Sequence, residues 1–113
     1  MDSSAHERFR EIELFPASEV PEGGMKPALV EGEEIVVFNL DGGFYALCDL
    51  CPHGSFRFSR GVVIGDAVMC PGHRWTFDVR TGRCRTTEWE PAVSYRVRVR
   101  EDGMVVVALP VRE

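Results

Sequence analysis

The sequence has no long apolar run and no recognisable export signal. A transmembrane helix needs about 20 consecutive apolar residues, and no stretch of these 113 residues comes near that length. The first eight residues lack the basic-then-apolar pattern that directs secretion. We therefore expect no membrane partner and a cytoplasmic location, where the cysteines stay reduced and free to bind metal instead of forming two disulfides.

The chain also lacks the usual motifs of catalysis and nucleotide binding. It contains no Ser/His/Asp arrangement, no phosphate-binding glycine loop and no flavin motif. It has only three histidines, and two of them, His53 and His73, follow cysteines at metal-ligand spacing. The remaining His6 cannot build a second iron site of two histidines and a carboxylate. The sequence predicts a protein that is not an enzyme by itself.

Basic residues are too few to make a nucleic-acid-binding face. The chain has 18 acidic and 13 basic side chains and a net charge of −5, whereas phosphate binding needs a clustered basic surface. The charge is uneven, because residues 1–47 carry −7 while residues 48–90 and 91–113 carry +1 each. The arginines of the middle segment either dock an acidic partner or are solvated loop residues; they are Arg57, Arg60, Arg74, Arg80, Arg83 and Arg85.

The periodicity of the sequence is that of β-strands, and no window of a dozen residues has a strong helical stripe. Residues 95–100 alternate strictly between apolar and polar side chains, as expected of a strand with one buried face. Asp41-Gly42 and Asp102-Gly103 are typical hairpin turns. We predict an all-β domain of short antiparallel strands in stacked small sheets, with one helical turn at 17–20. The expected strands are 9–15, 25–30, 34–40, 44–50, 62–64, 67–69, 95–100 and 104–109.

Two short turns carry the candidate metal ligands. Cys51-Pro52-His53 and Cys70-Pro71-Gly72-His73 each combine a thiol and an imidazole, and 16 residues separate the two pairs. Each turn follows an expected strand, and the 62–69 hairpin lies between them, so the two loops should meet at one tip of the domain. Two cysteines and two histidines at this spacing suit a zinc ion or an iron–sulfur cluster.

The spacing Cys-x-His, 16 residues, Cys-x-x-His resembles the signature of Rieske [2Fe-2S] proteins. The similarity continues into the flanking sequence, and it reaches the 95–109 hairpin. A stretch containing Pro91 also resembles the family's third loop over the cluster. The matching segments are 53–55, 75–78, 80–83 and 87–91. The resemblance implies one [2Fe-2S] cluster, with Cys51 and Cys70 on one iron and His53 and His73 on the other.

The resemblance also places this protein among the low-potential members. High-potential Rieske proteins join the two loops by a disulfide, and the corresponding positions here are Phe56 and Gly72. Trp75 and Phe77 stand where those proteins have hydroxyl donors to the cluster. Because fewer donors stabilise the added electron less, we expect a midpoint potential on the order of −150 mV.

By the same resemblance the chain is similar to the ferredoxin components of bacterial aromatic-ring-hydroxylating dioxygenase systems. Such a protein is a monomeric electron carrier between an NAD(P)H-dependent flavoprotein reductase and a terminal Rieske non-haem iron oxygenase. We expect a single domain, residues 1–113, with its cluster-binding part at about 48–91. Arg57 and Arg74 are the candidate docking residues, and His53 and His73 the points where electrons enter and leave.

Two alternatives remain open at the level of sequence. The first is a protein like the small subunit of assimilatory nitrite reductase, which shares this fold and size. The second is a zinc-stabilised interaction module, because Cys48 lies three residues before Cys51 and a Cys48, Cys51, Cys70 and His73 site is conceivable. Otherwise Cys48 and Cys84 are expected to be buried packing residues.

Overall fold

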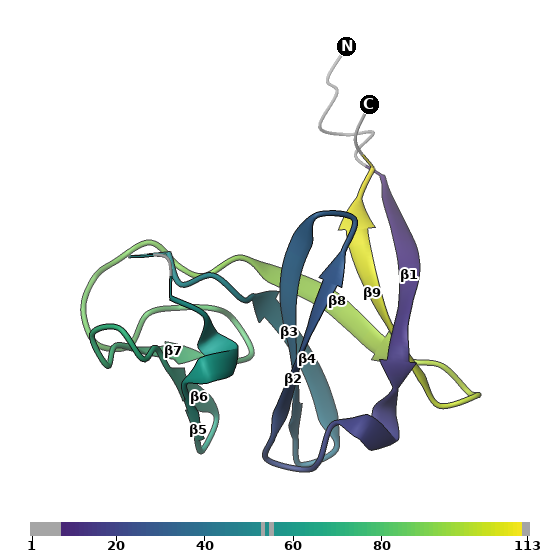
Figure 1. The fold of residues 1–113 in the computed structure, drawn as a ribbon, viewed down its shortest axis with the longest axis horizontal. Coiled ribbons are helices and arrows are strands. Elements are labelled where there is room, and N and C mark those ends of the chain that lie inside the picture. Colours follow the sequence, from purple (N-terminus) through teal and green to yellow (C-terminus); the bar gives the residue numbers. More distant parts are fainter. Residues whose placement is uncertain (1–7, 53, 55, 112–113) are drawn as a thin grey trace.

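The computed structural model describes residues 8–52, 54 and 56–111. Over these residues the chain forms antiparallel β-structure in two sheets, with two single turns of 3-10 helix, η2 (Ala17–Glu19) and η3 (Phe58–Arg60). Neither helical turn in the described part of the chain has the length or hydropathy to cross a bilayer. Figure 1 shows the smaller sheet and its loops beside the larger sheet. The predicted all-β class is confirmed.

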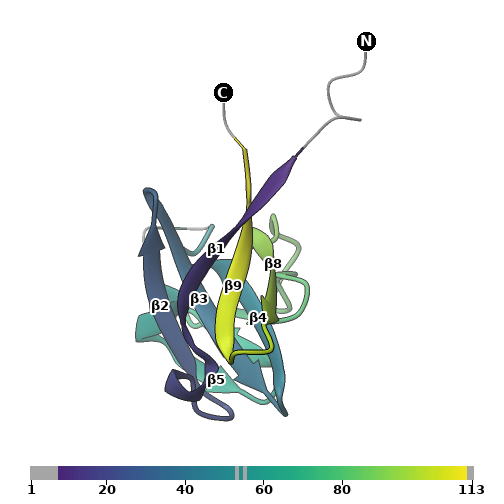
Figure 2. The same cartoon turned by 90° about the vertical axis from the view of Figure 1, so that its right-hand side faces the viewer.

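The larger sheet has six strands in the order β1-β9-β8-β4-β3-β2. It curls around a core of its own, and Figure 2 shows β1 close to β2 on the curled face. An ion pair between Arg10 on β1 and Glu31 in the β2–β3 turn links the two edges of the sheet. The strands are β1 (Phe9–Pro16), β2 (Met25–Val30), β3 (Glu33–Leu40), β4 (Gly43–Cys48), β8 (Ser94–Val99) and β9 (Met104–Pro110).

Local sequence explains the hairpins of this sheet. The β3–β4 turn places Asp41 at φ 52° and Gly42 at φ 82°, which is the left-handed pair that a two-residue hairpin requires. The β8–β9 turn ends at Gly103, with φ 89°. There the carboxylate of Asp102 accepts a hydrogen bond of 3.1 Å from the N–H of Met104. Both predicted hairpins are therefore confirmed.

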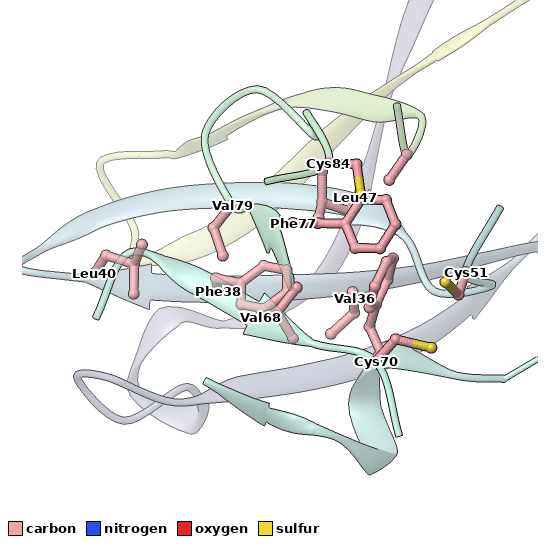
Figure 3. Close-up of a cluster of buried hydrophobic side chains, with 12 residues drawn as sticks. Val36, Phe38, Leu40, Leu47, Cys51, Val68, Cys70, Phe77, Val79 and Cys84 are labelled. Carbon is pink, nitrogen blue, oxygen red and sulfur yellow. The ribbon is translucent and has the colours of Figure 1, made fainter. Parts of the chain in front are cut away.

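The smaller sheet consists of β5 (Val62–Ile64), β6 (Ala67–Met69) and β7 (Thr76–Asp78). Its buried face packs on β3 and β4 of the larger sheet, as the labelled Val68 and Phe77 show beside Phe38 in Figure 3. Strand β3 is buried on both faces, because Val36 and Phe38 face this shared core while Val37 faces the core inside the curled sheet. The two loops that carry the candidate metal ligands lie next to this shared core.

Several boundaries differ from the sequence prediction. The strand expected at 44–50 ends at Cys48, and Leu50 forms only an isolated bridge to Arg57. Strand β7 was not predicted, because no hairpin turn marks it as the predicted turn at 65–66 marks β5 and β6, and its strand partner β6 lies seven or more positions away. Turn η3 was not predicted either. One of the two sheets is also larger than expected, because β8 joins the two hairpin systems through a short pairing with β4.

Candidate metal centre

The two candidate cysteines lie at one end of the shared core. Cys51 and Cys70 are 2% and 0% exposed and both belong to the same cluster of buried side chains. Figure 3 shows their sulfur atoms at the same end of that cluster. Neither is in a disulfide. The structure thus brings together two thiols that are 19 positions apart in the sequence, as the loop placement predicted.

Loop 1 (residues 49–60) presents Cys51. The N–H of Cys51 donates to the carbonyl of Phe56 at 2.8 Å, and the N–H of Phe58 donates to the carbonyl of Asp49, also at 2.8 Å. The carboxylate of Asp49, only 2% exposed, accepts hydrogen bonds from both the N–H and the hydroxyl of Ser59. These contacts close the base of the loop. The sequence analysis missed Asp49, since a single aspartate after a strand has no distinctive pattern.

Loop 2 (residues 70–75) presents Cys70 and His73, and it is closed in the same way as loop 1. The N–H of Cys70 donates to the carbonyl of Trp75 at 2.8 Å, five residues on, as Cys51 does to Phe56. The N–H of Arg74 donates to the carbonyl of Cys70 at 3.0 Å. Arg74 itself has φ 63°, a left-handed conformation that is uncommon for a residue with a side chain. Of the four predicted ligands, His53 lies outside the described residues.

Aromatic rings form a continuous row across the loops, here called the aromatic row: Phe56, His73, Trp75 and Trp89. Phe56 meets His73 edge-on, with ring centroids 6.1 Å apart. Trp75 meets Trp89 edge-on at 5.3 Å. Trp89 belongs to the third loop named in the sequence analysis, so the 87–91 segment does reach the same end of the molecule. Of these rings, Trp75 packs against the buried cluster that contains the two cysteines, and Phe56 and Trp89 remain nearly half exposed.

The arginines of residues 48–90 do not act as one basic rim. Arg57 makes a two-point ion pair with Glu34, at 2.7 and 3.1 Å. An acidic docking partner would therefore have to compete with Glu34 for this arginine. Arg80 and Arg85 pair with aspartates of the smaller sheet. Among the described residues, no ion-pair partner lies near the other three, which are Arg60, Arg74 and Arg83.

The aspartates of the smaller sheet respond to these arginines. The hydrogen bond from Arg85 holds the pKa of Asp66 below its ordinary value. Burial raises the pKa of Asp78, but hydrogen bonds from Arg85 and from the N–H groups of Thr81 and Arg80 outweigh it, so that this pKa is also lowered. Arg80 further donates to the Tyr45 hydroxyl at 3.1 Å, which links the smaller sheet to β4. This network connects the smaller sheet with the larger one.

The remaining cysteines do not join the site. Cys84 is buried in the shared core beside Phe77, which confirms the packing role expected for it. Cys48 ends β4 and is only partly buried, so the expectation of full burial was wrong. Within the described residues, no three His, Cys, Asp or Glu side chains gather around one possible ion position. The four residues of the zinc alternative are all described, and they do not assemble.

The donor set fits a binuclear cluster better than a single ion. A Rieske [2Fe-2S] centre takes only two protein ligands on each iron, so it needs two thiols on one side and two imidazoles on the other. Cys51 and Cys70 form a buried thiol pair at the loop end, and His73 lies three residues beyond Cys70. No buried side-chain nitrogen or oxygen in the described part of the chain is left without a partner.

Comparison with known proteins agrees with this geometry. Residues 10–107 match the model of the Rieske [2Fe-2S] domain. The chain belongs to the Rieske family. The cofactor of such a domain is a [2Fe-2S] cluster, as the spacing of the ligands predicted.

Three similar proteins illustrate the relationship. The ferredoxin component of the naphthalene 1,2-dioxygenase system of Pseudomonas aeruginosa is 43% identical over 72 residues, which cover 64% of this chain and 69% of the relative. A chain of the solved complex of reduced oxygenase and oxidized ferredoxin in carbazole 1,9a-dioxygenase is 31% identical, with a TM-score of 0.80 over 87% of this Rieske chain and 92% of that one. The putative nitrite reductase small subunit of Mycobacterium tuberculosis has a TM-score of 0.83 over 94% of this chain and 99% of that one, at 23% identity.

Proposed function

We propose that this Rieske protein is a ferredoxin that passes single electrons from an NAD(P)H-dependent flavoprotein reductase to a terminal oxygenase acting on an aromatic compound. The observation that carries the proposal is the paired, buried cysteines of two matched loops, in a chain whose relatives are ferredoxin components of dioxygenase systems. The solved complex of a reduced oxygenase with an oxidized ferredoxin supports the oxygenase as partner. The reductase, the cytoplasmic location and the monomeric state are part of the proposal.

In this proposal the chain is one domain, residues 1–113, whose cluster-binding part spans about 48–91. Cys51 and Cys70 hold the inner iron and His53 and His73 the outer one. When bound, a [2Fe-2S] cluster supplies a one-electron redox step. The buried thiols keep their end of the site away from water, and His73 lies in the aromatic row between the half-exposed Phe56 and Trp75. The chain thereby orients the outer ligand toward a partner and excludes water from the inner one.

The alternative of a nitrite reductase small subunit rests on similarity to two solved structures, at 23% and 25% identity. The structural likeness is strong, but the identity of 23% supports a shared fold and no shared role. A non-shuttling subunit of that kind would form a stable complex with a large catalytic subunit. An electron shuttle binds its partners transiently.

Spectroscopy and reconstitution test the proposal. The reduced protein should give the rhombic EPR signal of a Rieske centre, whereas a zinc protein is colourless and silent. The purified protein should then restore substrate turnover when it is added to a dioxygenase reductase and its terminal oxygenase. Turnover that does not depend on this protein would refute the carrier role, and permanent co-purification with a sirohaem subunit would favour the nitrite reductase alternative.

A further inference from the structure

The ring of Phe56 lies directly on the backbone of Gly72, so that loop 1 and loop 2 touch through an aromatic side chain. A methyl group added at Gly72 would overlap Cδ2 and Cε2 of this ring. The backbone of loop 1 fixes where the ring starts, because the Phe56 carbonyl accepts the hydrogen bond from the N–H of Cys51. One residue thus connects the inner ligand of loop 1 with the second loop.

Gly72 is required by this ring and not by its own backbone. Its φ does not lie in the left-handed region, whereas the turn glycines Gly42 and Gly103 do have positive φ. An alanine would therefore be conformationally acceptable at position 72. An alanine would instead force the ring of Phe56 to move.

The same ring also touches the outer ligand of loop 2. The Phe56 and His73 rings are at 85° with centroids 6.1 Å apart, which is the edge-to-face arrangement that aromatic pairs favour. Phe56 is nevertheless 45% exposed, so burial of apolar area explains little of its presence. Its contacts with Gly72 and His73 are its specific structural contribution.

We propose that Phe56 is a positioning residue that holds loop 2 against loop 1 and fixes the orientation of His73. Phe56 and Gly72 stand at the positions where high-potential Rieske proteins join the two loops by a disulfide, and neither is a cysteine in this sequence. The contact between them therefore lies where this protein has no covalent link. The inference rests on the proposed assignment of His73 as a ligand. It also implies that Phe56 and Gly72 act as a unit, because the ring and the space for it are both needed.

The test is a double-mutant cycle on the protein carrying its cluster. Phe56→Ala removes the ring, Gly72→Ala pushes it aside toward solvent, and a third protein carries both changes. The measured quantity is the rate at which an iron chelator bleaches the visible absorption. Each single variant should lose its cluster faster than the unmodified protein, and the double variant should be no faster than the worse single one. The departure from independent effects should be at least about threefold in rate, the scale of coupling between residues in contact.

A second readout separates positioning from general stability. The reduced-state EPR g values of Phe56→Ala and Gly72→Ala should differ from those of the unmodified protein, and Phe56→Leu should lie between, because leucine fills the space without an aromatic edge. Phe9→Ala is the matched control. Phe9 is 56% exposed at the far end of β1 and should leave both the bleaching rate and the EPR spectrum unchanged.

Results that overturn the role of Phe56 differ from results that overturn the proposed function. Unaltered bleaching rates, rates that multiply independently in the double variant, or unaltered g values would each overturn the role of Phe56. A Rieske EPR signal that survives His73→Ala would instead overturn the ligand assignment. Failure to support an oxygenase would count against the carrier role, and it would leave the measurement on Phe56 and Gly72 intact.

Discussion

Ser59 donates two hydrogen bonds to the buried carboxylate of Asp49, from its backbone N–H at 2.8 Å and from its hydroxyl at 2.7 Å. Asp49 lies two residues before Cys51, and Ser59 lies in η3 on the returning side of loop 1. The pair therefore fixes the two ends of the loop to one another.

Replacing Asp49 should loosen this loop and destabilise the fold. Asp49→Ala leaves the two Ser59 donors without an acceptor, which should lower the free energy of unfolding by about 1–3 kcal/mol. Ser59→Ala removes only the hydroxyl donor and should cost less, about 1 kcal/mol. Urea denaturation followed by circular dichroism measures both. Equal stability of Asp49→Ala and the unmodified protein would contradict the role given to this carboxylate.

The ligand assignment predicts a sharp difference between cysteines. Cys51→Ser and Cys70→Ser should abolish the visible absorption and leave little iron or acid-labile sulfide in the purified protein, because a hydroxyl is a poor ligand for this cluster. Cys48→Ser is the matched control. Its partly buried side chain takes no part in the proposed site, so this variant should retain a full complement of iron and sulfide. Loss of the cluster from Cys48→Ser with retention in Cys51→Ser would contradict the assignment.

The backbone conformation of Arg74 should lower the stability of the fold, whereas its positive charge should favour docking to the oxygenase. Its φ of 63° costs a residue with a side chain about 1 kcal/mol relative to glycine, so Arg74→Gly should raise the free energy of unfolding by that amount. It should also slow electron transfer to the oxygenase at low salt, since it removes a positive charge next to His73 that has no ion-pair partner among the described residues. Stopped-flow kinetics at two ionic strengths measure the rate.

Arg60→Gly is the comparison for Arg74. Arg60 is also without an ion-pair partner among the described residues, but it lies in η3 with a negative φ. The glycine variant at position 60 should not be stabilised. A gain in stability at position 60 equal to that at position 74 would show that the backbone conformation of Arg74 is not the cause.

The surroundings of the cysteines predict a low midpoint potential. Position 77 supplies no hydroxyl donor, because its residue is phenylalanine. Phe77 is fully buried in the shared core and packs edge-on against Phe58, with ring centroids 5.1 Å apart. A redox titration should give a value on the order of −150 mV. A midpoint potential above about +100 mV, in the upper part of the Rieske range, would contradict this.

The aspartates paired with Arg85 predict acid sensitivity. The pKa values of Asp66 and Asp78 are lowered from an ordinary value of 3.8. Their contribution to stability is therefore complete above that pH and is lost as the pH falls through the lowered values of the folded state. Arg85→Met should unfold with a smaller dependence on pH below about 4 than the unmodified protein, as measured by urea denaturation across a pH series. Identical pH profiles would rule out this ion-pair network as the source.

The sequence by itself determined the β3–β4 and β8–β9 hairpins, and its resemblance to Rieske proteins indicated the metal chemistry. Asp41-Gly42 specifies its turn because aspartate and glycine readily accept the left-handed backbone that a short hairpin needs. The alternation at 95–99 identifies β8 because a strand repeats every two residues. The spacing of Cys51, His53, Cys70 and His73 likewise indicates the cluster, because each pair of ligands is held within one short loop.

Only the tertiary structure decided what supports those ligands. Strand β7, the Asp49–Ser59 contact, the Glu34–Arg57 ion pair and the packing of Phe56 on Gly72 join residues that are 7 to 23 positions apart or lie in different loops. No local pattern encodes such contacts, because their geometry depends on how the two sheets pack around the shared core. The residue types proposed to bind the cluster are therefore readable in the sequence, whereas the side chains that join the two loops become visible only once the chain is folded.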